Sequence, residues 1–483
     1  MSTAAVAQKP PHLLVFPYPA QGHSLPLLDL THQLSLRNFT ITIITTPKNL
    51  PTLSPLLSFH PRIQTLILPL PSHPSLPGGV ENVKELGNAG NLPIIAALSK
   101  LYHTIIQWFR SHPNPPVSLI SDFFLGWTLR LANEINIPRF AFFSSGAFLA
   151  AVADHCWNNL ETVKTLDVVG FVDLPRSPSF KAEHLPSIFR LYEEYDPDWQ
   201  VVREGMLANT LSFGCIFNSC EALEGEYLGF LKKKMGHERV FGVGPLSLLG
   251  PDHSSRGNPD SGSFAHVFDW LDGCPDGSVV YVCFGSQKLM SKAQMEALAS
   301  GLEKSMARFI WVVKMGTTQQ VEDGYGIVPH GFEERIAGRG LIIRGWSPQV
   351  MLLSHRAVGG FLSHCGWNSV LEGIVNGVLI LAWPMEADQF VNGKLLVEDL
   401  GVAVRVCVGA DSVPDSDELG KVIGESMNGV GYEGEKMRAK GLKAKAVGAV
   451  RDGGRSSKDL DELVNELWKL QAKAKKDQLQ MQR

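Results

Sequence analysis

Short apolar runs and amphipathic stretches alternate along the first part of the chain. Residues 12–17 (HLLVFP) are apolar, residues 25–37 carry apolar positions at helical spacing, and residues 40–45 (TITIIT) are β-branched. A strand–turn–helix–strand order of this kind is typical of a parallel βαβ unit. The order recurs downstream, with a strand, a helix and a strand expected over residues 117–121, 124–135 and 139–143.

A second alternating series follows a segment rich in Gly, Ser, Pro and Asp (GPDHSSRGNPDSGS), a composition typical of a linker between domains. Its strands are expected over residues 279–284, 309–313, 341–344, 359–362 and 378–383, with a helix over 292–305. The pattern predicts an α/β protein with two doubly wound parallel-sheet, Rossmann-like domains that face each other across a cleft. We expect a first domain over 1–249, a linker over 250–264, a second domain over 265–460, and a C-terminal helix over 461–483 with the first domain as its candidate packing surface.

Polar side chains come directly after several of the predicted strands in both halves. They are His23, Asp122, Ser144, Ser286, His364 and Asp388. In open parallel sheets, ligands bind beyond the carboxyl ends of the strands. The sequence therefore predicts one ligand site in the cleft between the two domains.

Composition narrows the class of protein. Of the 483 residues, 44% are hydrophobic and 19% charged, and the formal net charge of −4 argues against a nucleic-acid-binding protein. The seven cysteines form no Cys-x-x-Cys pair, which predicts reduced, buried thiols. The start of the chain shows no signal-peptide pattern, and the apolar stretch over 140–153 is too short to span a bilayer. We expect a cytoplasmic monomer without a membrane span.

The most distinctive stretch of the chain runs over residues 346–389. Trp346 precedes Ser-Pro, and its indole face can stack a nucleobase, while the amide of Gln349 can meet a base edge or a ribose. Asp388 and Gln389 place a carboxylate beside an amide, which suits neighbouring hydroxyls of a sugar. Taken alone, Trp346 could equally be a core aromatic residue and Asp388 a helix cap.

A helix is expected to begin within the same stretch, at the turn that holds Gly366. Its free N–H groups and dipole favour an anion, and Ser369 and Glu372, three residues apart, share one face. We interpret this as a diphosphate site formed by the helix start with His364, Asn368 and Ser369, with Glu372 binding ribose hydroxyls. The alternative is an ordinary buried helix after a tight turn.

A candidate general base lies far upstream. His23 follows the first predicted strand and Asp122 ends another strand of the same sheet. A carboxylate that binds one ring nitrogen fixes the tautomer of a histidine and stabilises its charged form, so the other nitrogen can take a proton. Structural roles as a capping histidine and a capping aspartate are the competing interpretations.

The stretch over 346–389 resembles the signature segment of plant family 1 UDP-glycosyltransferases, which have the two-domain GT-B fold. The resemblance covers essentially the whole chain, including PYPAQGHSLPLLDLTHQL, SDFFLGW and VVYVCFGSQ. It is nearest to the subgroup that acts on flavonoids and small phenolic acids. The resemblance implies that His23 deprotonates the acceptor hydroxyl and that Asp122 orients His23.

The resemblance also implies a set of donor contacts. Uracil would stack on Trp346, near the Ser347 backbone and the Gln349 side chain. The diphosphate would lie against Ser286, His364, Gly366, Asn368 and Ser369, with the ribose on Glu372. The sugar would contact Ser144, Trp367, Asp388 and Gln389.

The expected reaction is inverting transfer of a sugar, most simply glucose, from a UDP-sugar to a hydroxyl of a small phenolic acceptor, giving a β-glycoside. No metal and no cofactor beyond the UDP-sugar co-substrate is expected, with the helix start and His364 neutralising the leaving group. The acceptor pocket is expected near Gly78, Phe123, Phe124 and Phe148 and over residues 180–199. Alternatives are a UDP-xylose donor, transfer to carboxyl, nitrogen or carbon, a non-catalytic nucleotide-sugar-binding protein, and a hydrolase that uses Ser286.

Overall fold

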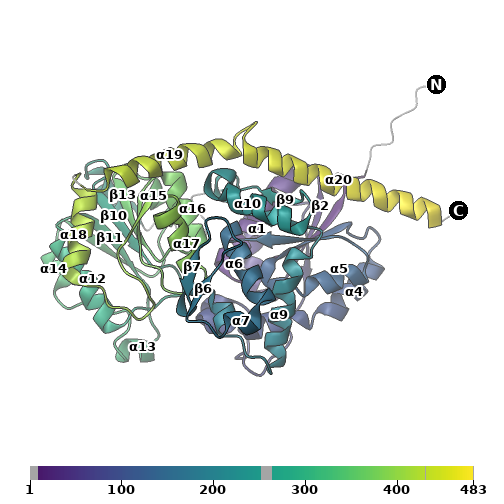
Figure 1. Ribbon diagram of the computed structural model, residues 1–483, viewed down its shortest axis with the longest axis horizontal. Helices are drawn as coiled ribbons and strands as arrows, with labels where there is room; N and C mark the ends of the chain where they lie inside the picture. The colour runs from purple at the N-terminus through teal and green to yellow at the C-terminus, as the bar shows by residue number, and fades with distance from the viewer. Residues whose placement is uncertain (1–8, 252–263, 430, 482–483) are drawn as a thin grey trace.

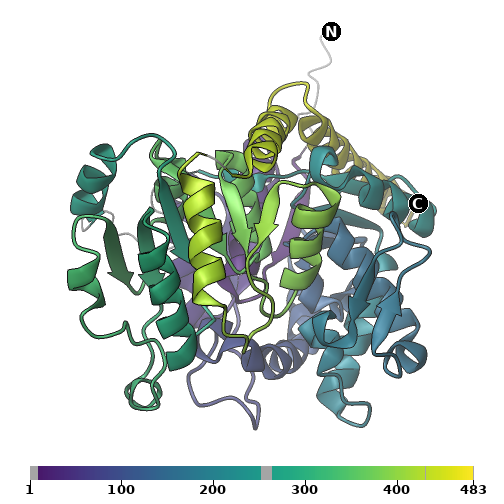
Figure 2. The ribbon, with the colours of Figure 1, turned by 60° about the vertical axis from the view of Figure 1, so that its left-hand side comes forward.

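The computed structural model describes residues 9–251, 264–429 and 431–481, so most of the predicted linker, residues 252–263, lies outside the described residues. Two parallel sheets, each flanked by helices, form two lobes side by side (Figure 1). The predicted architecture of two Rossmann-like domains is confirmed. Turned by 60°, the second sheet lies between its covering helices (Figure 2).

The first sheet has the strand order β3-β2-β1-β4-β5-β8-β9, all parallel. In spatial order these strands are β3 Gln64–Ile67, β2 Thr40–Thr45, β1 His12–Phe16, β4 Ser118–Asp122, β5 Arg139–Phe143, β8 Gly214–Phe217 and β9 Val240–Gly242. The order reverses between β1 and β4, which is where ligands bind in such sheets. His23 follows β1 and Asp122 ends β4, so both lie at this point.

The second sheet has the order β12-β11-β10-β13-β14-β15. Its strands are β12 Gly340–Arg344, β11 Arg308–Val313, β10 Val279–Cys283, β13 Val358–Ser363, β14 Leu379–Ala382 and β15 Ala403–Arg405. The order reverses between β10 and β13, and the turns that carry Ser286 and His364 follow these two strands. A separate antiparallel pair joins β6 Val168–Gly170 to β7 Ser179–Lys181.

Helices cover both sheets. Those that carry or support the candidate site are α1 Gln21–Leu36, α6 Ala147–Asn158, α10 Glu221–Met235, α15 Gln349–Ser354, α16 Trp367–Asn376 and α17 Gln389–Lys394. The others are α2 Ser54–Phe59, α3 Asn91–Ser99, α4 Tyr102–Ser111, α5 Thr128–Glu134, α7 Leu160–Val163, α8 Ser187–Arg190, α9 Pro197–Thr210, α11 Ala265–Asp272, α12 Lys292–Lys304, α13 Thr318–Glu322, α14 Phe332–Arg335, α18 Ser416–Met427, α19 Glu433–Val450 and α20 Arg455–Met481.

The helix predicted to begin at residue 25 begins four residues earlier, at Gln21. The prediction placed Pro26 in the first turn, where proline is tolerated, whereas the structure has Pro26 inside the helix. His23 therefore lies in the first turn of α1 and not in the loop before it. The predicted helix over 124–135 is also shorter, because a 3₁₀ turn over Phe123–Leu125 precedes α5.

The last helix, α20, runs along the first domain (Figure 1). Leu460, Leu463 and Leu467 are buried in one apolar cluster with the residues of β1 and β2. The carboxylate of Asp459 accepts a hydrogen bond from the backbone N–H of Gly242, at the end of β9, over 2.9 Å. The chain thus returns to its first sheet after completing the second.

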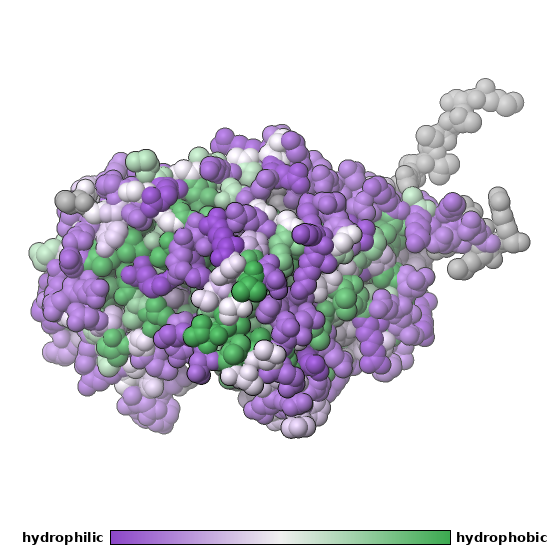
Figure 3. Space-filling model, viewed as in Figure 1, coloured by the Kyte–Doolittle hydropathy of each residue, from purple (hydrophilic) through white to green (hydrophobic). Residues whose placement is uncertain are grey.

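The surface is mostly polar. Hydrophilic residues cover most of the face in Figure 3, with hydrophobic residues in smaller groups between them. Within the described residues, no helix is long and apolar enough to cross a membrane. All seven cysteines are free; six are buried, as the sequence predicts, and Cys407 is partly exposed.

Candidate active site

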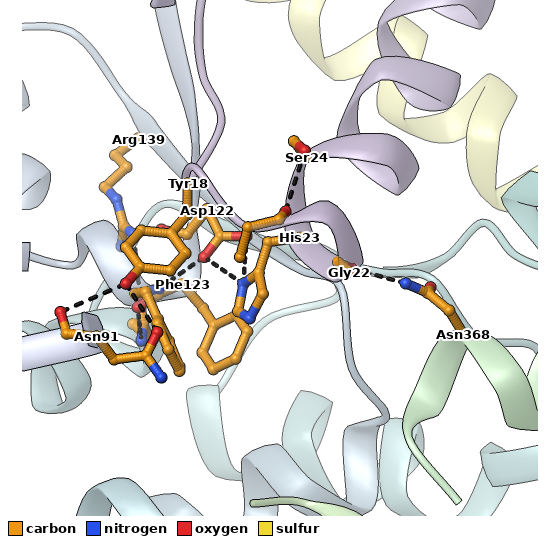
Figure 4. A network of polar contacts seen from close by, with 12 residues as sticks. Tyr18, Gly22, His23, Ser24, Asn91, Asp122, Phe123, Arg139 and Asn368 are labelled. Atoms are coloured by element: carbon orange, nitrogen blue, oxygen red, sulfur yellow. Dashed lines mark hydrogen bonds and ion pairs between the residues drawn. The ribbon is translucent and has the colours of Figure 1, made fainter. Parts of the chain in front are cut away.

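His23 and Asp122 form a direct contact at the carboxyl edge of the first sheet. The Nδ1 atom of His23 lies 3.1 Å from both carboxylate oxygens of Asp122 (Figure 4). The Asp122 side chain is fully buried, whereas 20% of the His23 side chain remains exposed. Because Nδ1 is held by the carboxylate, Nε2 is the nitrogen that can exchange a proton with a ligand.

Asp122 is itself fixed by the chain around it. Its carboxylate accepts the backbone N–H of Phe124 over 2.9 Å, and its carbonyl oxygen accepts a hydrogen bond from the buried guanidinium of Arg139. That guanidinium also donates to Ser121, Thr128, Asn209 and Ser212. Burial lowers the pKa of Arg139 to about 10, so the group stays charged at neutral pH.

Aromatic rings surround His23. Phe123 stacks on its face with ring centroids 5.3 Å apart, Phe124 lies 4.6 Å away, and Tyr18 presents an edge at 5.2 Å. Tyr18 and Phe123 are buried, and Phe124 is the partly exposed ring of the three, so it is the one that can meet a ligand beside His23. Phe148, also expected to line the pocket, is 1% exposed and stacks on Tyr227 in the core.

In the second domain, the turn between β13 and α16 holds His364 in a confined position. A Cβ atom on Gly285 would lie 2.8 Å from its Nε2, and one on Gly366 would lie 2.7 Å away. Burial lowers the pKa of His364 to about 4, so the ring is neutral. A neutral ring can offer a hydrogen bond to a leaving group, and the start of α16 can add the favourable potential of the helix dipole.

Cys365 adopts a left-handed backbone conformation, with φ of 65°, directly before Gly366, the N-cap residue of α16. Ser369 is 8% exposed on the first turn of this helix. Ser286 is exposed, on the turn after β10 next to Gly285. The predicted diphosphate residues of the second domain thus come from two neighbouring turns.

Gln349 links the residues predicted to bind the nucleoside. Its amide nitrogen lies 2.6 Å from a carboxylate oxygen of Glu372 and 3.2 Å from the Ser369 hydroxyl. Ser347 lies 2.8 Å from the hydroxyl of Tyr281, which also reaches the Gln349 carbonyl oxygen over 3.3 Å. The structure therefore brings together residues that the sequence predicted to bind the donor.

Trp346 stands at the edge of this set, half-buried, with the ring of Phe264 5.8 Å away in an edge orientation. One side of its indole therefore rests against the protein. Trp367, the other aromatic residue predicted to contact the donor, is more deeply buried. The Trp367 side chain is 4% exposed, and its indole N–H donates to the backbone oxygen of Asn218 over 2.8 Å. Its indole thus contacts the first domain.

Asp388 and Gln389 lie at the start of α17, where the Asp388 carboxylate interacts with the backbone of Trp367. Asp388 accepts a hydrogen bond from Asn392 over 2.8 Å, and burial raises the pKa of its carboxyl. The carbonyl oxygen of Gln389 accepts the backbone N–H groups of Met385 and Glu386, each at 3.0 Å. The side-chain oxygen of Gln389 is therefore held by the loop before α17, and Asp388 and Gln389 occupy consecutive positions at the start of this helix.

Ser144, the predicted contact from the first domain, is 5% exposed between β5 and α6. The helix that follows is capped by the buried carboxylate of Glu224, which accepts the N–H groups of Ala147 and Phe148 over 2.9 and 2.8 Å. Ser219 donates a third hydrogen bond to this carboxylate over 2.6 Å. Burial raises the pKa of Glu224, and these three bonds oppose that rise.

Sequence reasoning missed several supporting residues. They are Arg139, Asn218, Glu224 and Asn392. Only Arg139 carried a readable signal, as a charged residue that opens the apolar strand RFAFF. Its many partners come from separate elements, so their meeting depends on the fold.

The two halves of the site meet across the cleft. The side-chain amide of Asn368 donates to the backbone oxygen of Gly22 over 2.8 Å, directly before His23 (Figure 4). The predicted diphosphate residue and the predicted base are thus connected through one hydrogen bond. Among the described residues, no group of three or more His, Cys, Asp or Glu side chains could hold a metal ion.

Comparison with known proteins agrees with this geometry. The family model "UDP-glucoronosyl and UDP-glucosyl transferase" matches residues 257–443. UDP-glycosyltransferase 89A2 of Arabidopsis thaliana is 54% identical over 472 residues, covering 97% of this chain and 98% of that protein. Flavonol 3-O-glucosyltransferase UGT89B1 of the same plant is 48% identical over 460 residues, covering 94% and 95%.

Solved structures show the same likeness. The crystal structure of Arabidopsis thaliana UGT89C1 complexed with UDP-L-rhamnose has a TM-score of 0.78 and 39% identity, covering 95% of this chain and 100% of that one. The same protein complexed with quercetin has a TM-score of 0.75 and 38% identity over the same shares. The hydrolase and the non-catalytic binding protein are thereby set aside. The chain belongs to the plant family 1 UDP-glycosyltransferases, related to the flavonoid glycosyltransferases, and is an enzyme of the glycosyltransferase type.

Proposed function

We propose that this enzyme transfers glucose from UDP-glucose to a hydroxyl group of a flavonol or similar phenolic, with inversion at the anomeric carbon. The observation that carries the proposal is the contact of His23 with Asp122 at the cleft, next to the Gly22–Asn368 hydrogen bond. The acceptor O–H passes its proton to Nε2 of His23 as the oxygen bonds to the anomeric carbon. The bond from that carbon to the UDP oxygen breaks on the opposite face, giving a β-glycoside.

The donor half of the proposal rests on the second domain. Uracil is assigned to Trp346, the ribose to Glu372 and Gln349, and the diphosphate to the start of α16 with His364 and Ser286. Neutral His364 supplies a hydrogen bond, and the helix dipole supplies the favourable potential for the departing diphosphate. We propose that no metal takes part.

Glucose is proposed because Asp388, which interacts with the backbone of Trp367, and Gln389 place a carboxylate and an amide at consecutive positions at the start of α17. A carboxylate accepts from two neighbouring hydroxyls of a hexose, and the Gln389 amide nitrogen donates to a third oxygen. The name of the relative UGT89B1 as a flavonol 3-O-glucosyltransferase supports this choice.

UDP-rhamnose is the second candidate donor, because a relative with 39% identity has been solved with UDP-L-rhamnose. Rhamnose lacks the hydroxyl at carbon 6, so a site that uses this hydroxyl should reject it. UDP-xylose lacks carbon 6 altogether. For the acceptor, the alternative to a hydroxyl group is transfer to a carboxyl group, a nitrogen or a carbon.

The test is a competition of UDP-glucose, UDP-rhamnose and UDP-xylose for one flavonol, with the product identified by NMR. The proposal expects the glucoside as the main product, with a large anomeric proton coupling that marks the β configuration. A rhamnoside as the main product would establish the second candidate. A product linked through carbon or a carboxyl group would overturn the hydroxyl assignment.

A further inference from the structure

Two consecutive residues at the start of α16 bind the first domain. Trp367 donates its indole N–H to the backbone oxygen of Asn218, and Asn368 donates its amide N–H to the backbone oxygen of Gly22, both over 2.8 Å. Both acceptors are main-chain carbonyl groups. The helix start proposed to bind the diphosphate is therefore seated directly on the domain that carries the base.

The sequence explains why the Gly22 carbonyl can accept a hydrogen bond from another domain. In an α-helix the carbonyl of residue 22 accepts the N–H of residue 26, and here residue 26 is proline, which has none. Pro26 lies inside α1, beyond the first turn, and is buried. The hydrogen bond that the helix lacks is replaced by one from Asn368 in the other domain.

We propose that Pro26 is a positioning residue for the transfer reaction: by leaving the Gly22 carbonyl without its helical donor, it reserves that oxygen for Asn368. Gly22 directly precedes His23, so the bond fixes the base relative to the start of α16. The inference deepens the proposed function and depends on it where turnover is measured.

The side-chain amide of Asn368 can bind the Gly22 carbonyl and a diphosphate oxygen at the same time. A side-chain amide nitrogen carries two hydrogens. In Asn368 one of them points to Gly22, and the second is available for a diphosphate oxygen of the donor. The side chain then joins the leaving group to the turn that holds the base, which keeps the two reacting partners at a constant spacing.

A structural role and a positioning role predict different results for Pro26→Ala. Proline is the least favourable residue inside a helix, so alanine restores an N–H to the helix and should not lower its stability. The restored N–H also donates to the Gly22 oxygen, and a second donor on the same carbonyl weakens the bond from Asn368. We expect kcat to fall about three- to tenfold while the melting temperature is unchanged or higher, which is the effect of weakening one hydrogen bond.

The matched control is Pro51→Ala, because Pro51 also lies inside a short helix of the first domain but is exposed. Its kcat should equal that of the wild type. If Pro26→Ala keeps full kcat, or loses kcat only in step with its melting temperature, the proposal is overturned.

A double-mutant cycle tests the partner. Pro26→Ala should lower kcat in the wild type and have no further effect in an Asn368→Ala background, because the bond is then already absent. Equal effects in both backgrounds would overturn the assignment of Asn368 as the partner of this carbonyl.

A substrate-free readout separates this inference from the proposed function. Hydrogen–deuterium exchange of the peptide that covers the first turn of α16 should be faster in Pro26→Ala than in the wild type and unchanged in Pro51→Ala. Unchanged exchange in Pro26→Ala overturns the inference. A wild type that transfers no sugar to any phenolic would overturn the proposed function and leave this result intact.

Discussion

The imidazole of His23 is held by Asp122 through one ring nitrogen, with 3.1 Å from Nδ1 to each carboxylate oxygen. The carboxylate lies in the core and the ring lies partly in the cleft. This arrangement selects the tautomer with hydrogen on Nδ1, so the lone pair of Nε2 faces outward. It also stabilises the imidazolium that forms when Nε2 accepts a proton.

His23→Ala should lower turnover about 10²–10⁴-fold, because a positioned base contributes that much to proton transfer. UDP binding should survive, since its proposed residues lie in the second domain. Turnover is measured as UDP release with a flavonol, and binding by calorimetry with UDP. The exposed His103 provides the control, and His103→Ala should behave as the wild type. Full turnover in His23→Ala would remove the base assignment.

Gly285→Ala should weaken UDP binding. The new methyl group would meet Nε2 of His364 at 2.8 Å, so the ring must shift from the position in which it is proposed to bind the diphosphate. The backbone φ of Gly285 is also positive, at 76°, and adds strain.

Gly277→Ala separates these two effects, because Gly277 has a similar φ of 64° but open space around its Cβ position. Both variants should lose stability, by about 1 kcal/mol from backbone strain. Only Gly285→Ala should bind UDP more weakly in calorimetry. Equal UDP affinity in the two variants would show that His364 does not contact the diphosphate.

Much of the second-domain half of the site could be predicted from the sequence, because its residues lie within one short stretch. Ser369 and Glu372 share a helix face through their spacing, and Gln349 lies on the preceding helix, α15. Helical periodicity and the order of strands were enough to bring these residues to one edge of the sheet.

The contacts between the domains could not be predicted in this way. The indole N–H of Trp367 donates to the backbone of Asn218, 149 residues away, a contact that the sequence did not predict. Every residue has a main-chain oxygen, so the residue type does not show which of these oxygens accepts such a bond. The start of α1 was misplaced for a related reason, since an interior proline is compatible with a helix only when another group satisfies the freed carbonyl of Gly22.

Glu372→Ala should weaken binding of UDP about 10- to 100-fold, because a hydrogen bond to a charged group contributes about 1.5–3 kcal/mol. The carboxylate is proposed to bind the ribose, and it also orients Gln349 over 2.6 Å. Calorimetry should show the loss for UDP and not for inorganic pyrophosphate, which has no ribose.

The control is Glu333→Ala, which removes an exposed carboxylate paired with Arg344 on the surface of the same domain. It should leave both affinities unchanged. A parallel loss of UDP and pyrophosphate affinity in Glu372→Ala would place this carboxylate at the diphosphate or in the fold of the site, and not at the ribose.

Folding stability should fall as the pH drops from about 6.5 to 4, in part through His12 on β1. Its Nδ1 lies 2.6 Å from the Asn114 oxygen and its Nε2 lies 2.8 Å from the Thr42 hydroxyl, both satisfied by a neutral ring. Burial lowers the pKa of His12 from 6.5 to about 4. Between pH 6.5 and 4, His12 is protonated in the unfolded chain but remains neutral in the folded chain. The free energy of unfolding therefore falls as the pH drops below 6.5, by up to about 3 kcal/mol. Urea unfolding of the wild type and of His12→Gln checks this, because the carboxylates titrate alike in both chains. The stability advantage of the wild type should shrink between pH 7 and 4.5, and a constant advantage would contradict the prediction.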